Sequence, residues 1–487
     1  MQSNKAVIQT ILYFCAMARR KNTKKTFENV EVLDAGSKGK GIGKADDGRV
    51  LIIDQVVPGD IVDVTTYKKR KSYYQAKPHQ FVKLSSKRTE PVCQHFGVCG
   101  GCKWQNMAYE HQLFYKEKEV LENLKRIGKV EIAKTHPILG SEKIYFYRNK
   151  MEFSFSNSRW LTEKEISSEV DIADKNALGF HIPGMWDKIL NLEKCHLQGD
   201  PSNAIRNKVR DFATEHDLEF FNPRDQTGLL RTLMIRTSST GEFMILIQFF
   251  KEQKEKRKLL LDYIIKEFPE VNSLLYVINE KGNDTIYDQE IFTYYGEDHI
   301  FEEMEGLKFK INAKSFFQTN SEQAYELYKI TRSFANLTGE ELVYDLYTGT
   351  GTIAQFVAKK AKHVVGIESV PEAIKDAKSN AKLNGIENTS FFAGDMKKLF
   401  NSEFITKHGQ PDVIITDPPR DGMHKDVIQQ ILNVKPKRIV YVSCNSATQA
   451  RDLELMDEFY KVDESQAVDM FPQTHHVENV VCLSLRA

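Results

Sequence analysis

The sequence predicts a doubly wound α/β domain in its C-terminal part, a mixed α+β domain in the middle and a small β-barrel near the N-terminus. Strand-like and helix-like stretches alternate after residue 320, which is typical of a parallel sheet covered by helices. Short alternating strands separated by glycine-rich or Pro-Gly turns fill residues 27–84, as in small antiparallel barrels of OB-like size. The length of 487 residues also exceeds what one hydrophobic core usually spans.

The α/β domain is predicted from the period of its apolar residues and from its turns. Helices are expected at 321–336, 352–361, 371–385 and 424–434. Strands are expected at 341–347, 363–369, 389–395, 411–419 and 438–444, with a last strand at 480–485. Ligands of such sheets bind beyond the carboxyl ends of the strands, so the residues at those ends deserve the closest inspection.

The predicted barrel is basic. The whole chain has a net charge of only +1, but residues 17–90 hold 17 Lys or Arg against 9 Asp or Glu. The stretch "YKKRKSYYQAK" interleaves cations with three tyrosines, which suits phosphates and stacked bases. A solvated charged hairpin is the alternative interpretation. Lys68, Lys69 and Arg70 are therefore candidate RNA contacts.

The first residues are predicted to lie outside the barrel. An apolar run after Lys5 faintly resembles a signal peptide, but Met17 opens a basic start that is typical of cytosolic proteins. We therefore favour a cytoplasmic protein whose first 16 residues are an over-long start. No apolar run approaches about 18 residues, so no membrane span is expected. The predicted boundaries are 1–24 for the extension, 25–85 for the barrel, 90–310 for the central domain and 311–487 for the α/β domain.

Three of the seven cysteines cluster at the start of the central domain, as Cys93, Cys99 and Cys102. Seven cysteines in a chain of this length do not form a disulfide scaffold. In a reducing cytosol such a cluster indicates a metal site more often than a disulfide.

Polar or special residues end five successive predicted strands. In "DLYTGTGT", which follows the first strand, Gly349 and Gly351 allow a tight turn that brings backbone close to a ligand. Glu368 ends the second strand, where a carboxylate can accept both hydroxyls of a ribose. This combination favours a nucleoside cofactor held without a phosphate cradle. It points to S-adenosylmethionine (SAM) more than to NAD.

Asp395, Asp417 and Cys444 end the third, fourth and fifth strands. Each of them alone could be an ordinary strand terminator. The turn "TDPPR" offers one carboxylate and rigid carbonyls to a planar substrate. Cys444 offers a strong nucleophile, although an ordinary thiol pKa of about 8.5 leaves only a few per cent ionised at neutral pH.

A cysteine nucleophile is what methylation of a pyrimidine carbon requires, because C5 of uracil is barely nucleophilic. Addition of the thiolate at C6 gives an enolate whose C5 attacks a methyl sulfonium, and a base must then remove the C5 proton before the thiol is eliminated. Glu478, just before the last strand, is the candidate base. We interpret His475 and His476 as surface residues and Cys482 as part of the core.

The motifs "KSFFQTN", "DLYTGTGT", "DPPRDGM", "VSCN" and "HHVENV", in this order, resemble those of the RNA uracil-5 methyltransferases. The chain is most similar to the RumA-type enzymes of 23S ribosomal RNA, over roughly residues 25–487. The resemblance implies a class I (Rossmann-like) SAM-dependent methyltransferase domain with Cys444 as nucleophile and Glu478 as base. It also implies that SAM is surrounded by Gln318, Tyr347, Gly349, Gly351, Glu368, Asp395 and Asp417.

The resemblance extends to the cysteines and the barrel. Cys93, Cys99 and Cys102, with Cys195 from "NLEKCHLQ", look like the family's ligands of a [4Fe–4S] cluster. On spacing alone, four thiolates suit structural zinc equally well. The barrel looks like a TRAM domain, an RNA-binding module. The transfer-RNA branch of the family generally lacks both features, so their presence favours ribosomal RNA.

The stretch "YRNKMEFSF" also matches the family, and it makes Arg148 and Lys150 candidate RNA contacts. The alternative interpretation is that both are ordinary charged residues at the edge of a strand.

The sequence thus predicts a monomeric enzyme that methylates C5 of a specific uridine in 23S ribosomal RNA. Methylation of a transfer-RNA uridine or of an RNA cytosine stays open, although cytosine-5 enzymes usually carry Pro-Cys where this chain has Pro-Pro-Arg. An adenine-N6 methyltransferase would have no need for Cys444. A non-enzymatic alternative is an RNA-binding ribosome assembly factor, whose RNA binding would be unaffected by replacing Cys444.

Overall fold

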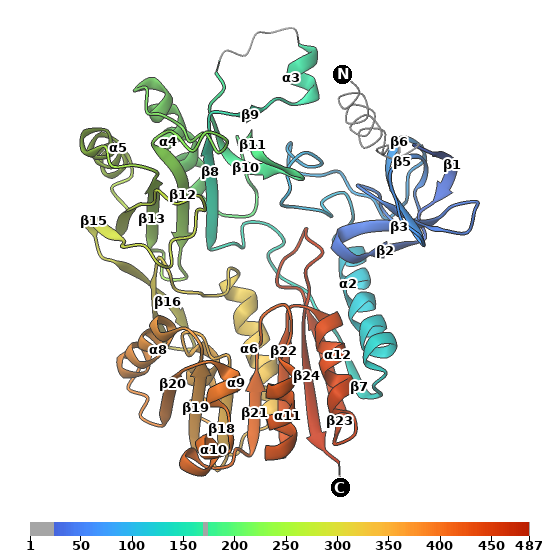
Figure 1. Cartoon of the computed structure of the whole chain (residues 1–487), viewed down its shortest axis with the longest axis vertical. Helices are drawn as coiled ribbons and strands as arrows, with labels where there is room; N and C mark the ends of the chain where they lie inside the picture. The colour runs from blue at the N-terminus through green and yellow to red at the C-terminus, as the bar shows by residue number, and fades with distance from the viewer. Residues whose placement is uncertain (1–23, 169–173, 487) are drawn as a thin grey trace, which may run out of the picture. The chain divides into compact units, whose positions relative to one another are not determined.

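A computed structural model describes residues 24–168 and 174–486 (Figure 1). The expectations for the N-terminal extension and its start lie outside the described residues. The chain divides into two compact units, Met1–Glu90 with Asn106–Ala108, and Pro91–Gln105 with Tyr109–Ala487. None of the helices described is long and apolar enough to cross a membrane.

The first unit is a strongly curved sheet of six strands. Valine, isoleucine and leucine side chains alternate along the strands and fill its interior, as the sequence predicts. The backbone amide of Leu33 donates to the carbonyl of Ile42 at 2.8 Å, which joins the end of the first strand to the third. The strand order is β1-β5-β6-β4-β3-β2. The strands are β1 (Thr26–Glu31), β2 (Asp34–Gly36), β3 (Lys40–Lys44), β4 (Val50–Ile53), β5 (Ile61–Lys69) and β6 (Tyr73–Lys83).

The central part of the second unit is a mixed eight-stranded sheet covered by α4 and α5. Its strand order is β15-β14-β13-β12-β8-β10-β11-β9. The strands are β8 (Lys150–Ser156), β9 (Arg159–Trp160), β10 (Ala177–Ile182), β11 (Met185–Asn191), β12 (Leu230–Thr237), β13 (Phe243–Phe249), β14 (Ser273–Ile278) and β15 (Phe292–Gly296). The helices are α3 (Glu163–Ser167), α4 (Ser202–Glu215) and α5 (Lys254–Glu267). A hairpin, β16 (His299–Met304) and β17 (Leu307–Asn312), leads into the α/β domain.

The C-terminal sheet has eight strands in the order β20-β19-β18-β21-β22-β24-β23-β7. The first five are parallel, and β24 and β23 are antiparallel to their neighbours β22 and β24. The strands are β18 (Leu342–Leu346), β19 (His363–Glu368), β20 (Thr389–Ala393), β21 (Val413–Thr416), β22 (Arg438–Ser443), β23 (Tyr460–Val468) and β24 (Glu478–Leu485). This confirms the predicted doubly wound α/β fold.

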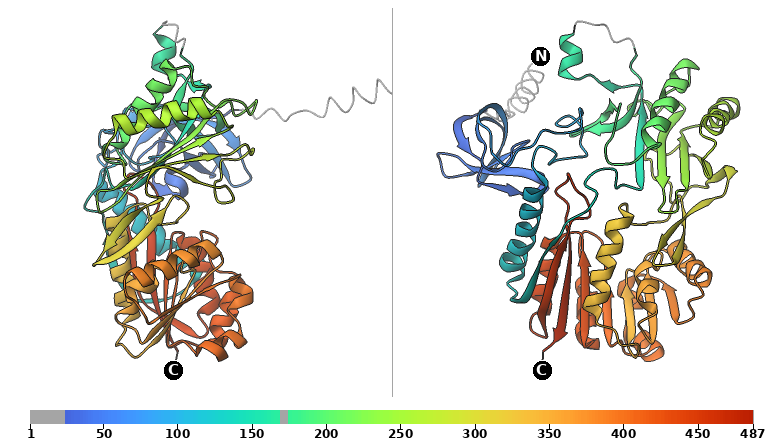
Figure 2. Two further views of the ribbon diagram at one scale, coloured as in Figure 1. Left: turned by 90° about the vertical axis from the view of Figure 1, so that its left-hand side faces the viewer. Right: turned by 180° about the vertical axis from the view of Figure 1, so that it is seen from behind.

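Helices cover both faces of this sheet (Figures 1 and 2). Successive strand residues such as Val440 and Tyr441 pack into opposite layers of core, because side chains alternate across a strand. One face carries α6 (Ser321–Ala335), α7 (Thr352–Ala358) and α8 (Pro371–Leu383). The other carries α2 (Tyr109–Asn123), α9 (Met396–Leu399), α10 (Ser402–His408), α11 (Lys425–Val434) and α12 (Ser446–Met456).

The C-terminal sheet also recruits a segment that the sequence assigned to the central domain. Strand β7 (Ile132–Leu139) pairs in parallel with β23, for example Ile132 with Val462. Helix α2 packs on the sheet just before it, and one π-helical turn (Leu124–Gly128) continues the helix. The apolar pattern of β7 is weak because the strand lies at the edge of the sheet. Its pairing with the C-terminal sheet could therefore not be predicted from the sequence.

A buried ion pair fixes α2 to the turn between β23 and β24. Lys116 Nζ lies 2.6 Å from a carboxylate oxygen of Asp469, and both side chains are fully buried. The Tyr109 hydroxyl donates to the other oxygen of Asp469 at 2.9 Å. Such a pair costs desolvation when it forms, but removing one partner strands the other charge in the interior.

Replacing Lys116 by Met should therefore lower the free energy of unfolding of the second unit by about 3–5 kcal/mol, because it leaves Asp469 buried without its cation. The double variant Lys116→Met/Asp469→Leu should recover much of this loss. The shift of the urea midpoint measures both effects. Arg126→Met, which breaks an exposed pair with Glu122, is the control and should change stability by less than about 1 kcal/mol. A double variant no more stable than the single one would contradict the prediction.

Candidate active site

The ends of five strands meet at one edge of the C-terminal sheet. The parallel strands β18, β19, β21 and β22 all end there. Strand β24 runs the opposite way and begins there, since Asn479 is the register partner of Ser443. Antiparallel pairing thus brings Glu478 beside the end of the strand that precedes Cys444.

The turn after β18 has the backbone of a ligand-binding loop. Tyr347, Gly349 and Gly351 all have positive φ, of 65°, 56° and 75°. A Cβ at Gly351 would lie 2.9 Å from the Cβ of Ala377, so this position requires glycine for both conformation and space. The amide of Gly349 donates to Glu368 Oε2 at 3.3 Å, which holds the carboxylate at the end of β19 against the loop.

Asp345, at the base of this loop, was not singled out from the sequence. Its Oδ2 accepts hydrogen bonds from the Thr348 hydroxyl at 2.5 Å and from the Ala354 amide at 3.1 Å. Its Oδ1 is buried and has no hydrogen-bond partner in the protein. Burial, reinforced by the charge of Glu368, raises the pKa of Asp345 to about 7. An unpaired buried carboxylate oxygen under a glycine turn fits a site for a polar ligand such as SAM.

The two remaining candidates for SAM contacts lie on other segments. Asp395 is exposed after β20, where its side chain accepts from the Lys397 amide at 3.0 Å and caps α9. Gln318 is half-buried before α6, and its carbonyl accepts from Asn149 Nδ2 at 2.9 Å.

Cys444 lies between a strand and a helix rather than before a turn. The polar residues that follow it, which the sequence suggested to be turn-forming, begin helix α12. Asn445 caps this helix by accepting from the Ala447 amide at 3.2 Å. Its Nδ2 also donates to the carbonyl of Arg420 at 3.0 Å. The cysteine turn and the "DPPR" turn are thereby fixed to each other.

The side chains of Cys444, Glu478 and Asp417 lie close enough together for their charges to interact. Burial raises the pKa of Glu478 to about 8, and the charge of Asp417 adds to the effect. Burial and the charge of Asp345 raise the pKa of Asp417 to about 7. Burial, then Glu478 and Asp417, raise the pKa of Cys444 to about 11. At neutral pH the empty site therefore favours the protonated thiol and the protonated Glu478.

Arg420 is the cation that opposes this crowding. Its charge acts to lower the pKa of both Cys444 and Glu478, and its side chain is exposed. It also disfavours protonation of His475 and His476. Arg420 is the arginine of the motif "DPPRDGM", but nothing in the sequence distinguishes it from the other surface cations.

The two histidines are not surface residues, in contrast to the interpretation from sequence. Both are half-buried, and their rings lie 4.1 Å apart between centroids. Burial lowers the pKa of His475 to about 3 and that of His476 to about 4, with nearby cations adding to the effect. Both imidazoles are therefore neutral at neutral pH, and they lie on the turn that leads to Glu478.

The four candidate ligand cysteines come together in the second unit. Cys93, Cys99, Cys102 and Cys195 line one small cavity. Burial raises the pKa of Cys99 to about 11 and that of Cys102 to about 12, and the neighbouring cysteines reinforce both shifts. Thiols in such surroundings ionise only when a cation compensates their charge, which fits a metal site.

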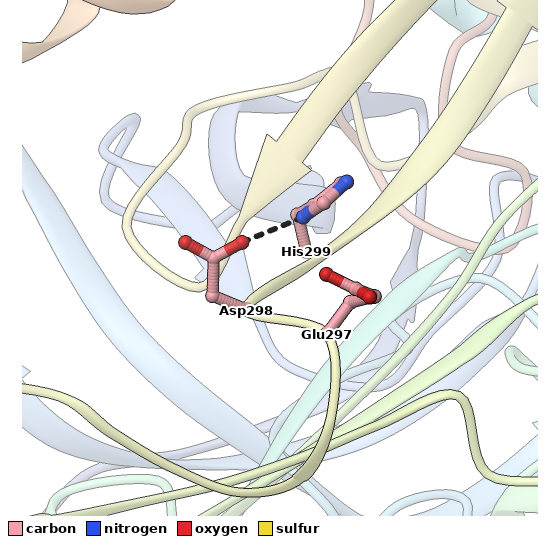
Figure 3. A group of neighbouring side chains, drawn as sticks. All are labelled: Glu297, Asp298 and His299. Atoms are coloured by element: carbon pink, nitrogen blue, oxygen red, sulfur yellow. Dashed lines mark hydrogen bonds and ion pairs between the residues drawn. The ribbon is translucent and has the colours of Figure 1, made fainter.

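No three of the four cysteine sulfurs lie within 4.8 Å of one another in the part of the chain that the structure describes. Ligands at a Zn–S distance of about 2.3 Å lie within about 4.6 Å of one another. Among the described residues, one group of three potential metal ligands has its ligand atoms within 4.8 Å of one another. It consists of Glu297, Asp298 and His299 and includes none of the cysteines (Figure 3). In that group Asp298 already contacts His299 at 2.6 Å and Lys310 at 3.3 Å, so the ammonium group of Lys310 balances its charge.

The candidate RNA contacts differ in their surroundings. Lys68, Lys69 and Arg70 are exposed at the end of β5 in the first unit. In the second unit, Lys150 Nζ pairs with Glu152 at 2.6 Å. Arg148 is half-buried with its guanidinium 5.2 Å from the ring centroid of Phe471, so packing already fixes much of its position.

Known proteins match both parts of this architecture. Residues 290–486 match the tRNA (Uracil-5-)-methyltransferase family, and residues 23–77 match the TRAM domain. An uncharacterized RNA methyltransferase of Bacteroides thetaiotaomicron is 59% identical over 92% of this chain and 100% of its own length. One from Porphyromonas gingivalis is 54% identical over 93% of this chain and 99% of its own length.

Among solved structures, the tRNA (uracil-54, C5)-methyltransferase of Pyrococcus abyssi in complex with S-adenosyl-L-homocysteine superposes with a TM-score of 0.70. It is 27% identical, and the match covers 94% of this chain and 100% of that one. The fold and site thus define a SAM-dependent RNA methyltransferase with an N-terminal TRAM domain. The chain belongs to the RNA uracil-5 methyltransferase family.

One argument from the sequence does not survive this comparison. A match over 94% of the chain has to include most of the barrel, and it is made by an enzyme whose name assigns it to tRNA. The barrel therefore does not separate ribosomal RNA from transfer RNA as the substrate.

The raised pKa of Glu478 predicts a pH-dependent stability of the protein without ligands. Its folded pKa of about 8 lies above the ordinary value, so stability is present at low pH and is lost as the pH rises through about 8. Glu478→Gln removes this titration. The variant should melt a few degrees above the parent at about pH 9 and at the same temperature at about pH 4.

Differential scanning fluorimetry across this pH range measures the effect. Glu458→Gln, at an exposed position, is the matched control and should follow the parent throughout. Equal melting temperatures of Glu478→Gln and the parent at both pH values would refute the assignment of a buried, titrating Glu478.

Proposed function

We propose that the protein transfers the methyl group of SAM to C5 of a specific uridine in 23S ribosomal RNA. The observation that carries this proposal is the convergence of Cys444, Glu478 and Asp417 at one sheet edge, where Asp417 raises the pKa of Glu478 and both carboxyl groups raise the pKa of Cys444. SAM, once bound, supplies the methyl group and a positive sulfonium charge. The loop 347–351 and Glu368 are the proposed SAM-binding elements, with Gln318, Asp395 and Asp417 from neighbouring segments.

In the proposed reaction the Cys444 sulfur adds to C6 of uracil, and the electrons of the C5–C6 double bond move onto C5 and the O4 carbonyl. C5 would then bond to the methyl group of SAM as the bond between that methyl group and the sulfonium breaks, which leaves S-adenosyl-L-homocysteine. The Glu478 carboxylate takes the C5 proton, the C5–C6 double bond re-forms and the C6–S bond breaks, which returns the thiolate. Asp417 is the proposed contact of the uracil ring, and Arg420 favours the ionised forms of Cys444 and Glu478.

The raised pKa values fit this order of events. Cys444 and Glu478 are both neutral in the empty site at neutral pH, so the thiol and the base are not ionised until substrates bind. A cationic substrate group nearby would lower both pKa values, because it stabilises the negative forms. The nucleophile would then be generated only when the methyl donor is in place.

Ring stacking gives the site a way to hold the target base. Phe316, two residues before Gln318, is exposed to 69% of its area. An exposed aromatic side chain is what unstacked RNA bases pack against. We propose that Phe316 contacts the target uracil or its neighbour.

Transfer RNA is the second candidate substrate, and one observation favours it. The Pyrococcus abyssi relative named as a tRNA (uracil-54, C5)-methyltransferase matches nearly the whole chain. The exposed cations Lys68, Lys69 and Arg70 suit either RNA, because phosphate contacts carry no sequence information.

We propose a [4Fe–4S] cluster on Cys93, Cys99, Cys102 and Cys195. The small cavity that the four cysteines line and the mutual effects on the pKa values of their thiols support a shared site, and the resemblance to the family favours iron over zinc. The proposed reaction transfers no electrons, so a structural role or a role in RNA binding follows for the cluster.

Tritium release tests the proposed function. RNA transcribed with uridine tritiated at C5 should release tritium only when SAM is present, and Cys444→Ala should abolish the release. Large-subunit ribosomal RNA and transfer RNA are assayed in parallel, and RNA with tritiated cytidine is the control. Release from ribosomal RNA alone supports the proposal, and release from transfer RNA alone moves the substrate to that class. No release from any uridine-labelled RNA would overturn the assignment.

Metal analysis of protein purified without oxygen tests the cluster. Iron and acid-labile sulfide should be present in equal amounts, and Cys195→Ser should lose both. Cys482→Ser, at a cysteine in the core of β24, is the matched control and should keep them. Stoichiometric zinc without sulfide would show that the site is a structural zinc centre instead.

A further inference from the structure

The turn between β23 and β24 connects the proposed base to the cysteine segment. Residues 469–477 make up this turn, and Glu478 follows directly. Most of the turn is buried although it carries many polar groups, including Gln473 at 2% and Thr474 at 4% exposure. A buried turn must satisfy its polar groups inside the protein, so its partners determine where Glu478 lies.

Gln473 has an uncommon backbone conformation in this turn. Its φ is +67°, in the left-handed region that residues other than glycine and asparagine rarely adopt. Such a conformation persists only where surrounding contacts impose it, and it is found most often at functional sites. Gln473 is five residues from Glu478, and it is the residue of the turn whose conformation most needs support.

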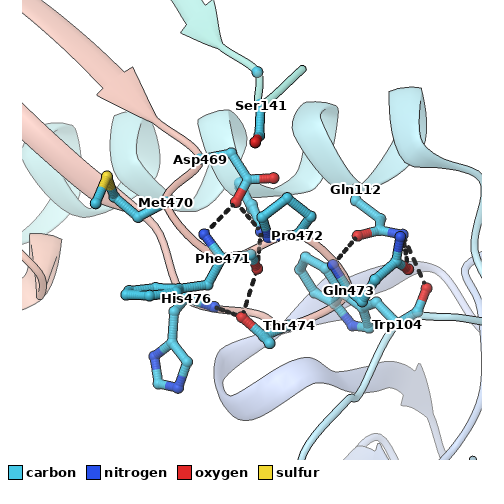
Figure 4. A network of polar contacts seen from close by, with 12 residues as sticks. Trp104, Gln112, Ser141, Asp469, Met470, Phe471, Pro472, Gln473, Thr474 and His476 are labelled. Carbon is cyan, nitrogen blue, oxygen red and sulfur yellow. Dashed lines mark hydrogen bonds and ion pairs between the residues drawn. The ribbon is translucent and has the colours of Figure 1, made fainter. Parts of the chain in front are cut away.

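Four hydrogen bonds hold Gln473 in place (Figure 4). Its amide donates to Gln112 Oε1 at 2.9 Å, and Gln112 Nε2 donates back to its side-chain oxygen at 3.0 Å. Its carbonyl accepts from the amides of Lys103 at 2.9 Å and Trp104 at 3.1 Å. These two amides come directly after Cys102, one of the proposed cluster ligands.

Helix α2 supplies the side-chain partners from one face. Tyr109, Gln112 and Lys116 are spaced by three and four residues, so they point the same way. Gln112 binds Gln473, and the other two bind Asp469 at the start of the turn. The start and the middle of the turn are therefore attached to one rigid helix.

Within the turn, further bonds carry this attachment toward Glu478. The Thr474 hydroxyl donates to the carbonyl of Phe471 at 2.7 Å. The amide of His476 donates to the Thr474 hydroxyl at 3.2 Å. Only Val477 lies between His476, the last residue of this network, and the proposed base. Few backbone torsions are therefore free to absorb a displacement of Gln473 before it alters the position of Glu478.

We propose that Gln473 is a positioning residue for Glu478, held by Gln112 and by the backbone that follows Cys102. The inference rests on the proposed function, because it takes Glu478 as the group that removes the C5 proton. Cys444 is on a different turn, which is fixed by α12 and by the Arg420 carbonyl instead. Loosening Gln473 should therefore slow proton removal and leave thiolate addition and methyl transfer unchanged.

A pair of RNA substrates separates these steps. RNA containing 5-fluorouridine has no proton at C5, so the reaction stops at the methylated covalent adduct whether or not the base is in place. The rate of adduct formation on fluorinated RNA then reports on addition and methyl transfer. Ordinary uridine RNA tritiated at C5 reports on proton removal, and an adduct that survives denaturing gel electrophoresis reports on a stalled elimination.

Gln112→Leu is the first variant, because it removes both side-chain bonds to Gln473 while keeping the volume. It should form the fluorinated adduct at the parental rate, release tritium about 10²-fold more slowly and accumulate adduct on ordinary RNA. Gln473→Asn is the second variant, since asparagine tolerates a positive φ and is too short for the bond to Gln112. It should show the same pattern more weakly, and it provides the test if Gln112→Leu does not fold.

Gln248→Leu is the matched control. Gln248 is an equally buried glutamine whose Nε2 donates to the carbonyl of Asp284 in the central domain, away from the turn. It should match the parent in all three assays. A parallel fall of fluorinated-adduct formation and tritium release in Gln112→Leu and Gln473→Asn would overturn the proposal, because it would mean a general loss of structure.

Glu478→Gln distinguishes this failure from failure of the proposed function. If Glu478 is the base, this variant forms the fluorinated adduct and accumulates adduct on ordinary RNA. Accumulation in Glu478→Gln without accumulation in the Gln112 and Gln473 variants would refute the positioning role alone. No accumulation in Glu478→Gln would refute the role of Glu478, and with it both proposals.

Discussion

The pairing of β24 antiparallel to β22 is the constraint on which the candidate site depends. A sheet of parallel strands alone delivers only residues that follow strands to its carboxyl edge. The antiparallel strand adds a residue that begins a strand, and Glu478 thereby comes next to the turn that carries Cys444. The same reversal creates the turn 469–477, which has to be buried because it lies against α2 and the cysteine segment. The pair Lys116–Asp469 meets the electrostatic requirement of that burial.

Ionisation of the carboxyl groups in the candidate site is unfavourable unless a cation is bound there. Asp345, Asp417 and Glu478 are three carboxyl groups with raised pKa values, and Tyr328 lies close enough for all three to raise the pKa of its phenol. Burial is the largest cause of each shift. Such an arrangement gains most from a cationic ligand, because every carboxylate that ionises then finds a compensating charge. The protein thus spends stability on a site that suits a sulfonium better than a neutral nucleoside.

Much of the fold was predictable because its elements are strongly periodic. The helices and strands predicted after residue 320 lie within a few residues of those in the structure, but β23 and the helices α9, α10 and α12 were not predicted. The glycine turn and the acidic strand ends fall where the doubly wound pattern requires. Strand β7 was not predictable, since an edge strand that pairs with a distant segment leaves no pattern of its own. Helix α12 was not predicted, because Asn445 and Ser446 at its start suit turns and helix caps equally.

The site residues divide in the same way. Cys444, Glu478 and Asp417 follow or precede apolar runs, so their places at the sheet edge could be inferred. The burial of His475 and His476 could not, because it depends on a turn packed against a helix more than 350 positions earlier in the chain, as in the pair Gln112 and Gln473. The role of Asp345 is equally hidden, since an aspartate within a strand gives no sign of an oxygen left without a partner.

The distance in sequence between Gln112 and Gln473, 361 residues, has a consequence for folding. Contacts between segments this far apart form late, because the intervening chain must be ordered first. During synthesis the barrel, the cysteine segment and helix α2 all emerge before the turn that α2 is shaped to hold. The face of α2 that carries Lys116 therefore has to remain hydrated until the C-terminal hairpin arrives. Docking of that hairpin then excludes water from the surroundings of Lys116. At the same time it brings Glu478 into the active site.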